Sequence, residues 1–154
     1  MGIGTSWSEA GLCERHIIML GRKVSQGMAF TKGIPRLFTS PLVIDGVAMG
    51  TEGMKYSFVN REIIANTREM NINTHNYDAF VGISDCDKTM PGMLIAAARF
   101  NITFVMLYGG SALNDYLKGK TITMEDVFEA VGTFSAGRFT EKEFKELENS
   151  TIIQ

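Results

Sequence analysis

The sequence predicts an α/β fold: a parallel sheet of about four strands with flanking helices. Apolar runs of strand length alternate with segments whose apolar residues recur every three or four positions, as in helices. Most of the strand-like segments are spaced roughly 30 residues apart, the spacing of β–α–β units. A chain of 154 residues can bury one core, and we expect residues 1–154 to form a single α/β domain.

The first half of the chain contains two predicted strands and two predicted helices. Residues 2–7 are expected to form the stub of a strand, and His16–Phe30 has the apolar periodicity of a helix. Arg36–Ile44 carries a short extended run that Pro41 interrupts, because proline lacks the N–H that a strand needs. Met54–Ile72 has an apolar stripe along one side and is predicted to be the second helix.

The second half begins with the clearest strand signals. Ala79–Ser84 is predicted to be a buried strand, and Pro91–Phe100 a helix with proline in its first turn. Ile102–Tyr108 is apolar on both faces, which is typical of a central strand in a parallel sheet. Helices are expected at Thr123–Phe134 and Thr140–Leu147, because each begins with a threonine three residues before a carboxylate, as in a capping box.

Composition and charge exclude several classes of protein. Hydrophobic residues make up 45% of the chain and charged residues 21%, which is the balance of a globular protein. The net charge of −2 gives no electrostatic attraction to nucleic acid, and no apolar run reaches the roughly 18 residues of a membrane span. Two cysteines cannot form a disulfide framework, and the first residues lack the pattern of a signal peptide. We therefore expect a cytoplasmic protein.

Polar side chains follow each predicted strand. Cys13 comes after the first strand, Asp45 after the second, Cys86-Asp87-Lys88 after the third and Gly109-Gly110 after the fourth. In a parallel sheet these loops lie along one edge, where ligands bind. The sequence therefore predicts a polar site that includes both cysteines of the chain.

The two cysteines have two interpretations. Cys13 and Cys86 are far apart in sequence and could be inert buried thiols, which is common for two isolated cysteines. As ligands, soft thiolates would favour zinc or an iron–sulfur cluster over magnesium. Two thiolates close neither kind of site, so this interpretation requires further ligands.

The charged residues also have two interpretations. Asp45 and Asp87 could hold a hard cation such as Mg²⁺, or could serve only in turns and helix caps. Lys88 could be a solvated surface lysine, or a buried amine with a lowered pKa.

Three long segments resemble the dihydroxy-acid dehydratase family, which includes phosphogluconate and sugar-acid dehydratases. The segments are Ser6–Cys13, Ile44–Ser57 and Ser84–Met93, and the resemblance extends to about Glu148. The Cys-Asp-Lys-Thr-Met-Pro-Gly-Met and Asp-Gly-Val-Ala-Met-Gly runs carry most of it. No dinucleotide-binding glycine fingerprint or phosphate-binding loop points to a nucleotide-binding domain instead.

The resemblance implies a hydro-lyase that converts a 2,3-dihydroxy carboxylic acid to a 2-keto acid. The substrate would be a small branched-chain precursor or a sugar acid, and the cofactors an iron–sulfur cluster (2Fe-2S or 4Fe-4S) and Mg²⁺. By position, Cys13 and Cys86 match cluster ligands, while Asp45 and Asp87 match magnesium ligands. Lys88 matches a catalytic lysine that relatives carbamoylate, so that its carbamate binds the magnesium.

The resemblance also implies missing parts. Relatives place a third cluster cysteine soon after the segment matching 145–148, and here residues 149–154 contain none. We expect the chain to correspond to the N-terminal part of a dehydratase, without the C-terminal β-rich domain. It would act in a homo-oligomer or with a partner segment; alternatively, it is a truncated non-catalytic remnant or a subunit that needs a partner chain.

Overall fold

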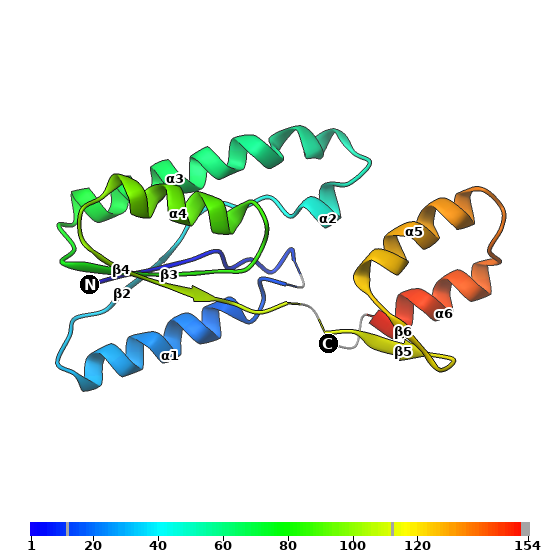
Figure 1. Ribbon diagram of the computed structural model, residues 1–154, viewed down its shortest axis with the longest axis horizontal. Helices are drawn as coiled ribbons and strands as arrows, with labels where there is room; N and C mark the ends of the chain where they lie inside the picture. Colours follow the sequence, from blue (N-terminus) through cyan, green and yellow to red (C-terminus); the bar gives the residue numbers. More distant parts are fainter. Residues whose placement is uncertain (12, 112, 152–154) are drawn as a thin grey trace. The chain divides into compact units, whose positions relative to one another are not determined.

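The computed structural model contains four parallel strands in the order β2-β1-β3-β4 (Figure 1). Their bounds are β1 Gly2–Thr5, β2 Arg36–Thr39, β3 Ala79–Ser84 and β4 Thr103–Tyr108. Gly2 of β1 lies beside Arg36 on one neighbour and Phe80 on the other, so β1 and β3 form the middle of the sheet. The predicted four-stranded parallel α/β fold is confirmed.

The structure describes residues 1–11, 13–111 and 113–151. The contacts among them separate a first unit, residues 1–110, from a second unit that begins at Ser111. The first unit holds the sheet and every site residue predicted from the sequence. Among the described residues, no helix combines the length and apolarity required to cross a lipid bilayer.

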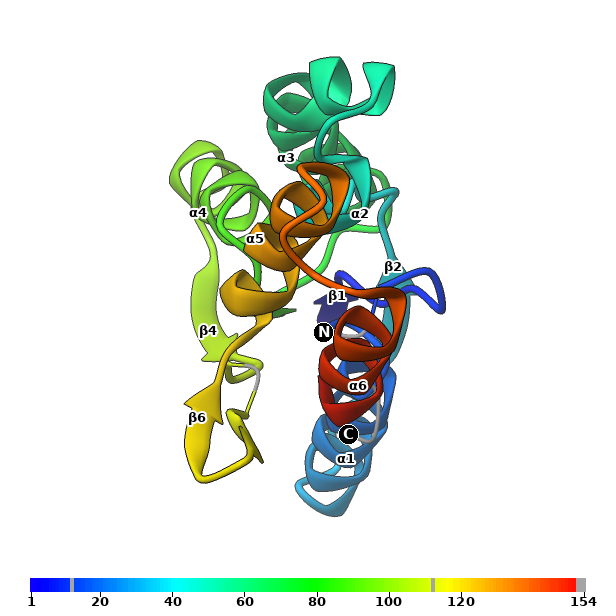
Figure 2. The same cartoon turned by 90° about the vertical axis from the view of Figure 1, so that its right-hand side faces the viewer.

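Three long helices cover the two faces of the sheet. α1 (Ile17–Phe30) lies on one face, and α3 (Ser57–Thr74) and α4 (Thr89–Arg99) lie together on the other (Figures 1 and 2). Between β2 and α3 the chain forms the short helix α2 (Asp45–Ala48) and the 3₁₀ turn η1 (Glu52–Tyr56). The sheet is therefore doubly wound, with helices on both sides.

Several predicted boundaries differ from the observed ones, each for a local reason. β2 ends at Thr39, short of the predicted Ile44. The amide of Ser40 still donates to the carbonyl of Thr5, but Pro41 has no N–H with which to continue the ladder. The second long helix begins at Ser57 instead of Met54, because the Thr51 side chain caps the separate turn η1. α4 begins two residues before Pro91, which still lies within the first turn.

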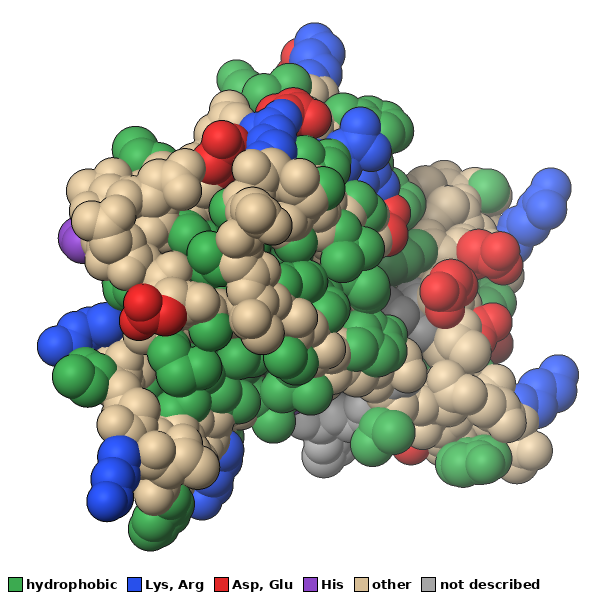
Figure 3. All heavy atoms as spheres, turned by 60° about the vertical axis from the view of Figure 1, so that its left-hand side comes forward, with side chains coloured by type: hydrophobic (Ala, Val, Ile, Leu, Met, Phe, Trp, Pro, Cys, Tyr) green, Lys and Arg blue, Asp and Glu red, His purple; other side chains and the backbone are tan. Residues whose placement is uncertain are grey.

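The prediction of a central strand at Ile102–Tyr108 was wrong in one respect. The strand exists as β4, but within the described sheet it lies at the edge. Val105 is 55% exposed and Leu107 36%, while Phe104 packs on the opposite side against the core below α3 and α4. Hydrophobic side chains are accordingly visible across one flank of the first unit (Figure 3).

Each face of the sheet has its own apolar core, because alternate residues of a strand point to opposite faces. Phe80 of β3 packs toward α3 and α4, whereas Ile83 of the same strand packs toward α1. The buried residues of the first core are Ala65, Ile72, Phe80, Met93, Ala96 and Phe100; those of the second are Ile3, Ile17 and Ile83.

A fully buried arginine holds the end of β1 against α3. The Arg68 guanidinium donates a hydrogen bond to the carbonyl of Thr5 and lies 5.2 Å from the centre of the Phe38 ring. Burial lowers the pKa of Arg68 to about 9. The contact fixes the point at which the chain leaves β1 for the polar loops.

Gly92 permits the close approach of α4 to α3, and its replacement by alanine should be destabilising. A Cβ at this position would lie 2.8 Å from the carbonyl oxygen of Arg61 and 3.0 Å from Cβ of Ile64. We expect Gly92→Ala to lower the free energy of unfolding by about 1–3 kcal/mol, as overpacking does. Gly27→Ala in α1 is the matched control, because a Cβ there meets nothing within 4 Å. It should raise stability by about 0.5–1 kcal/mol in urea unfolding, since alanine favours helix; a gain at both positions would contradict the packing argument.

The second unit contains a hairpin that the sequence reasoning missed. β5 (Asp115–Leu117) and β6 (Lys120–Ile122) pair antiparallel through Lys118 and Gly119, which both have positive φ. The strands are only three residues long, too short for a detectable alternation. The helices α5 (Met124–Ser135) and α6 (Glu141–Thr151) follow. Both predicted capping boxes are present, with Thr123 bonded to Asp126 and Thr140 to Glu143.

Candidate metal centre

The candidate site lies where the connections of the sheet diverge. From β1 the chain passes through α1 to β2, whereas from β3 it passes through α4, on the opposite face, to β4. The loops that follow β1 and β3 therefore separate at the carboxyl ends of two adjacent strands. In open α/β sheets this switch point is where ligands bind.

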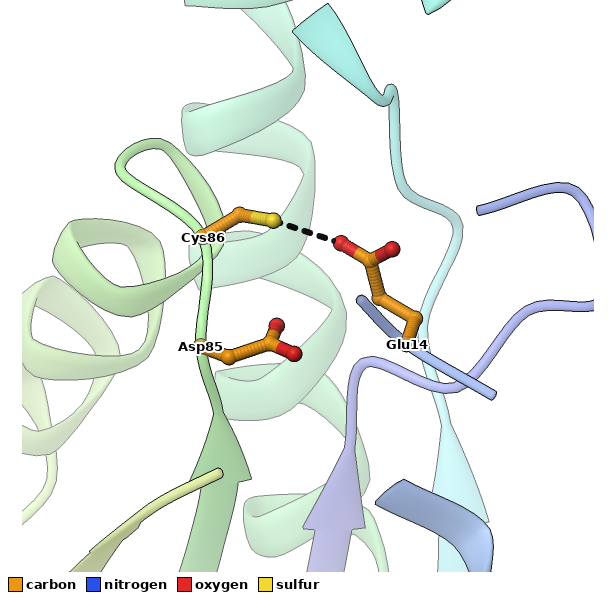
Figure 4. A group of neighbouring side chains, drawn as sticks. All are labelled: Glu14, Asp85 and Cys86. Carbon is orange, nitrogen blue, oxygen red and sulfur yellow. Dashed lines mark hydrogen bonds between the residues drawn. The ribbon is translucent and has the colours of Figure 1, made fainter. Parts of the chain in front are cut away.

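Three side chains from these two loops converge (Figure 4). Glu14, Asp85 and Cys86 each offer one donor atom, and these atoms lie within 4.8 Å of one another. The Cys86 thiol donates a hydrogen bond of 2.7 Å to Oε1 of Glu14. Glu14 is fully buried and Asp85 is 8% exposed, so the group is largely shielded from solvent.

Local hydrogen bonds fix the loop that carries Asp85 and Cys86. The Thr89 hydroxyl accepts hydrogen bonds from Ser84 Oγ at 2.7 Å and from the Cys86 amide at 3.1 Å. Across the site, Nε2 of His16 lies 2.7 Å from the carbonyl oxygen of Gly109, which joins the start of α1 to the end of β4. The loops are thus tied to the sheet on both sides of the switch point.

Cys13 adjoins the same group. Its thiol is half-buried and lies close enough to the Cys86 side chain to influence its pKa, so the two cysteines of the chain are neighbours. Burial raises the pKa of Cys13, and burial together with the hydrogen bond to Glu14 raises the pKa of Cys86. Without a metal, both side chains are therefore neutral thiols at neutral pH.

The two carboxyl groups have oxygens that the protein leaves unsatisfied. Oε2 of Glu14 lacks a hydrogen-bond partner among the described residues. Both oxygens of Asp85 also lack a hydrogen-bond partner among the described residues. The nearby backbone and thiol of Cys86 only partly offset the rise that burial causes in the pKa of Asp85. Burial is the main cause of the raised pKa values of both Glu14 and Asp85.

The raised pKa values predict that the metal-free first unit loses stability as the pH rises. The folded state keeps protons on Glu14 and Asp85 that the unfolded chain loses near their ordinary pKa values of 4.5 and 3.8. This contribution is complete below those values and is lost as the pH rises through the folded pKa values. Glu14→Gln should make the fall in unfolding free energy between acidic and neutral pH smaller, measured by urea unfolding, because glutamine has no proton to lose. Glu9→Gln, an exposed control in the same loop, should leave the pH profile unchanged.

Asp45, Asp87 and Lys88 form a second charged group. The ammonium of Lys88 lies 2.9 Å from Oδ2 of Asp45 and 2.5 Å from Oδ2 of Asp87. Lys88 also lies 5.3 Å from the centre of the Phe58 ring, and its side chain is only 15% exposed. Asp87 is 72% exposed, whereas Oδ1 of Asp45 is buried without a partner among the described residues.

This contact set overturns the interpretation of Lys88 as an amine with a lowered pKa. Hydrogen bonds to Asp87 and Asp45 raise the pKa of Lys88, because both carboxylates stabilise the ammonium. A surface lysine is equally excluded by its small exposure. In the metal-free chain Lys88 is a partly buried cation between two carboxylates.

The structure thus groups the predicted residues into two sets, the sulfur pair Cys13 and Cys86 and the charged set Asp45, Asp87 and Lys88. Their roles as ligands stay predictions. Sequence reasoning missed Glu14 and Asp85, although each directly adjoins one of the cysteines. An acidic residue beside each cysteine was the available signal.

The fold and this site define the chain as a doubly wound α/β protein with thiols and carboxylates at its switch point. The family model described as dihydroxy-acid/6-phosphogluconate dehydratase N-terminal matches residues 1–154, and the chain belongs to this family.

Proteins named dihydroxy-acid dehydratase are similar to the chain along nearly all of its length. The protein from Picrophilus torridus is 54% identical over 152 residues, which cover 99% of this chain and 28% of the relative. The protein from Sulfurisphaera tokodaii is 49% identical over 152 residues, 99% of this chain and 27% of the relative. That from Pelagibacter ubique is 44% identical over 148 residues, 96% of this chain and 26% of the relative. The chain therefore spans about a quarter of the length of these curated relatives.

Proposed function

We propose that this chain supplies metal ligands to a hydro-lyase that dehydrates a 2,3-dihydroxy carboxylic acid to a 2-keto acid. The family to which it belongs and the naming of its relatives support dehydration of a dihydroxy acid. The single observation that carries the proposal is the meeting of both cysteines with buried carboxyl groups at the switch point.

Cys13 and Cys86 are the residues proposed to hold an iron–sulfur cluster. The donor set fits such a group, because thiolates are the preferred ligands of iron in clusters and the two thiols adjoin one another. The site is also shielded from solvent on the side of Glu14 and Asp85. His16 would act as a positioning residue, since its bond to Gly109 orients the start of α1 behind Cys13.

Asp45, Asp87 and Lys88 are proposed to hold Mg²⁺, with Lys88 converted to a carbamate. Oxygen donors suit this ion, and the buried Oδ1 of Asp45 lacks a partner that a cation would provide. Lys88 now balances both carboxylates as an ammonium. Addition of CO₂ to the Lys88 amine, with loss of two protons from the ammonium, would replace this positive charge with a negative one and leave three anionic groups to bind the cation.

When bound, the cluster and the magnesium ion would supply Lewis acidity toward the departing hydroxyl and the substrate carboxylate. The residues of this chain would bind the metals and hold the loops at the ends of β1 and β3 in place. A small hydroxy acid, either a branched-chain precursor or a sugar acid, is the proposed substrate class, and cytoplasmic metabolism the proposed setting.

Anaerobic reconstitution tests this proposal. The chain is incubated with ferrous iron, sulfide and a reductant, desalted, and analysed by visible absorption and by iron and sulfide content. We expect sulfur-to-iron charge-transfer bands with iron and sulfide in equal amounts. Formation of a 2-keto acid is then assayed with a dihydroxy acid and Mg²⁺, for the chain alone and for the chain in its complete assembly.

The outcomes separate the two interpretations of the chain. Charge-transfer bands that survive desalting support the cluster, and 2-keto acid formation in the assembly supports the hydro-lyase. A colourless protein without bound sulfide would contradict the cluster assignment and favour a non-catalytic chain.

A further inference from the structure

We propose that Glu14, Asp85 and Cys86, with Cys13 as the fourth donor, bind a single borderline divalent transition-metal ion such as Zn²⁺ or Co²⁺. This mixed sulfur–oxygen site shares its two cysteines with the proposed cluster, and rests on the proposed function only in that respect. It differs by using two carboxylates as ligands and by requiring no sulfide.

The donor geometry is close to that of a mononuclear site. One donor atom from each of Glu14, Asp85 and Cys86 falls within 4.8 Å of the others. In a tetrahedral site with bonds of about 2.0–2.3 Å, ligand atoms lie about 3.5 Å apart. The three donors would therefore need to close by up to about 1.3 Å, while the 2.7 Å hydrogen bond from Cys86 to Glu14 opens. Cys13 lies outside this group of three and would have to move toward it to become the fourth ligand.

Glu14 and Asp85 lack the hydrogen bonds and ion pairs that usually stabilise buried carboxyl groups. Glu14 is fully buried with Oε2 unsatisfied, and Asp85 is 8% exposed with both oxygens unsatisfied among the described residues. None of the ion pairs among the described side chains joins either carboxylate to lysine or arginine. Buried acidic groups are normally paired, neutralised or bound to metal. A divalent cation would satisfy these oxygens and balance their charge.

The donor chemistry selects the class of ion. Two thiolates disfavour Mg²⁺ and Ca²⁺, which prefer oxygen, while two carboxylates disfavour ions that require only soft ligands. Zn²⁺ and Co²⁺ accept cysteine and carboxylate together, and Zn²⁺ favours four tetrahedral ligands. On binding, sulfur–metal bonds replace the S–H bonds of Cys13 and Cys86, and oxygen–metal bonds replace any O–H bond that Glu14 or Asp85 still has. The two thiol protons and any carboxyl protons leave to solvent.

Titration with Co²⁺ tests the site through its spectrum. The reduced 154-residue chain is titrated anaerobically without iron or sulfide, and tetrahedral d–d bands with sulfur-to-cobalt charge transfer are expected at one ion per chain. Zn²⁺ should displace Co²⁺ and bleach these bands, whereas Mg²⁺ should not. Glu14→Gln and Asp85→Asn should each weaken Co²⁺ binding by about 10–100-fold. Glu9→Gln, in the same loop but exposed, is the matched control and should bind as the original chain does.

A second measurement on the unaltered chain keeps the proposal testable if a variant fails to fold. X-ray absorption of the Zn²⁺-bound chain should give a mixed first shell of sulfur and oxygen. A shell of sulfur alone or of oxygen alone would overturn the proposal, as would Co²⁺ bands that Glu14→Gln and Asp85→Asn both leave unchanged. This experiment does not test the proposed function, because the cluster is judged by bound iron and sulfide and the Co²⁺ titration contains neither.

Discussion

Phe80→Ala is expected to lower the free energy of unfolding of the first unit by about 3–5 kcal/mol, the range for removing a buried phenylalanine. Phe80 is 1% exposed and its ring packs against Phe38, Phe100 and Phe104 at centroid distances of 5.5–6.0 Å. Truncation would remove these contacts and leave a cavity between β3 and the helices α3 and α4. Because a domain is typically stable by only about 5–15 kcal/mol, this loss would be a large share of the stability of the unit.

Phe30→Ala is the matched control, because Phe30 ends α1 and is 89% exposed. It should change the unfolding free energy by no more than about 0.5 kcal/mol. Urea unfolding followed by circular dichroism measures both variants. Equal effects at the two positions would contradict the core described for this face of the sheet.

Cys86→Ser should abolish the charge-transfer bands of the reconstituted chain, whereas Asp45→Asn should preserve them. The substitution replaces the soft thiolate of Cys86 with a hydroxyl, which is a poor ligand for iron in a cluster. Asp45 belongs to the charged set with Lys88, at 2.9 Å from its ammonium. Asp45→Asn should instead weaken Mg²⁺ binding by about 10-fold or more, measured by calorimetry.

Loss of both properties in either variant would indicate a general failure to fold, which circular dichroism would reveal. In folded proteins, charge-transfer bands that persist in Cys86→Ser would contradict the proposed cluster ligand. Unchanged Mg²⁺ affinity in Asp45→Asn would contradict the proposed magnesium ligand.

The elements with strong periodicity could be predicted from the sequence, whereas their positions in the sheet could not. β3 and α1 followed from apolar spacing, since burial dictates the residue types at these positions. β4 was expected to be central because it is apolar on both faces, yet it is an edge strand in the described sheet. Strand order is set by contacts distant in sequence, which local patterns do not record. The three-residue strands of the hairpin were too short to leave any pattern.

The sequence predicted where the site lies, but not all of the residues that form it. Parallel strands bring the loops after β1 and β3 to one edge, which placed Cys13 and Cys86 together. The burial of Glu14 and Asp85 was not apparent, because an acid in a loop is usually solvated. Only the tertiary packing showed that these two are buried, whereas the neighbouring Asp87 is exposed.

The sulfur and carboxyl donors come from loops that only the adjacency of β1 and β3 brings together, and Glu14 and Cys86 are 72 positions apart. A nascent chain would therefore present no local chelate of the kind that closely spaced cysteines provide. Metal acquisition would come after formation of the sheet, so the acceptor of the metal would be the folded chain. Iron supplied before folding would find isolated thiols, open to oxidation and to non-specific exchange.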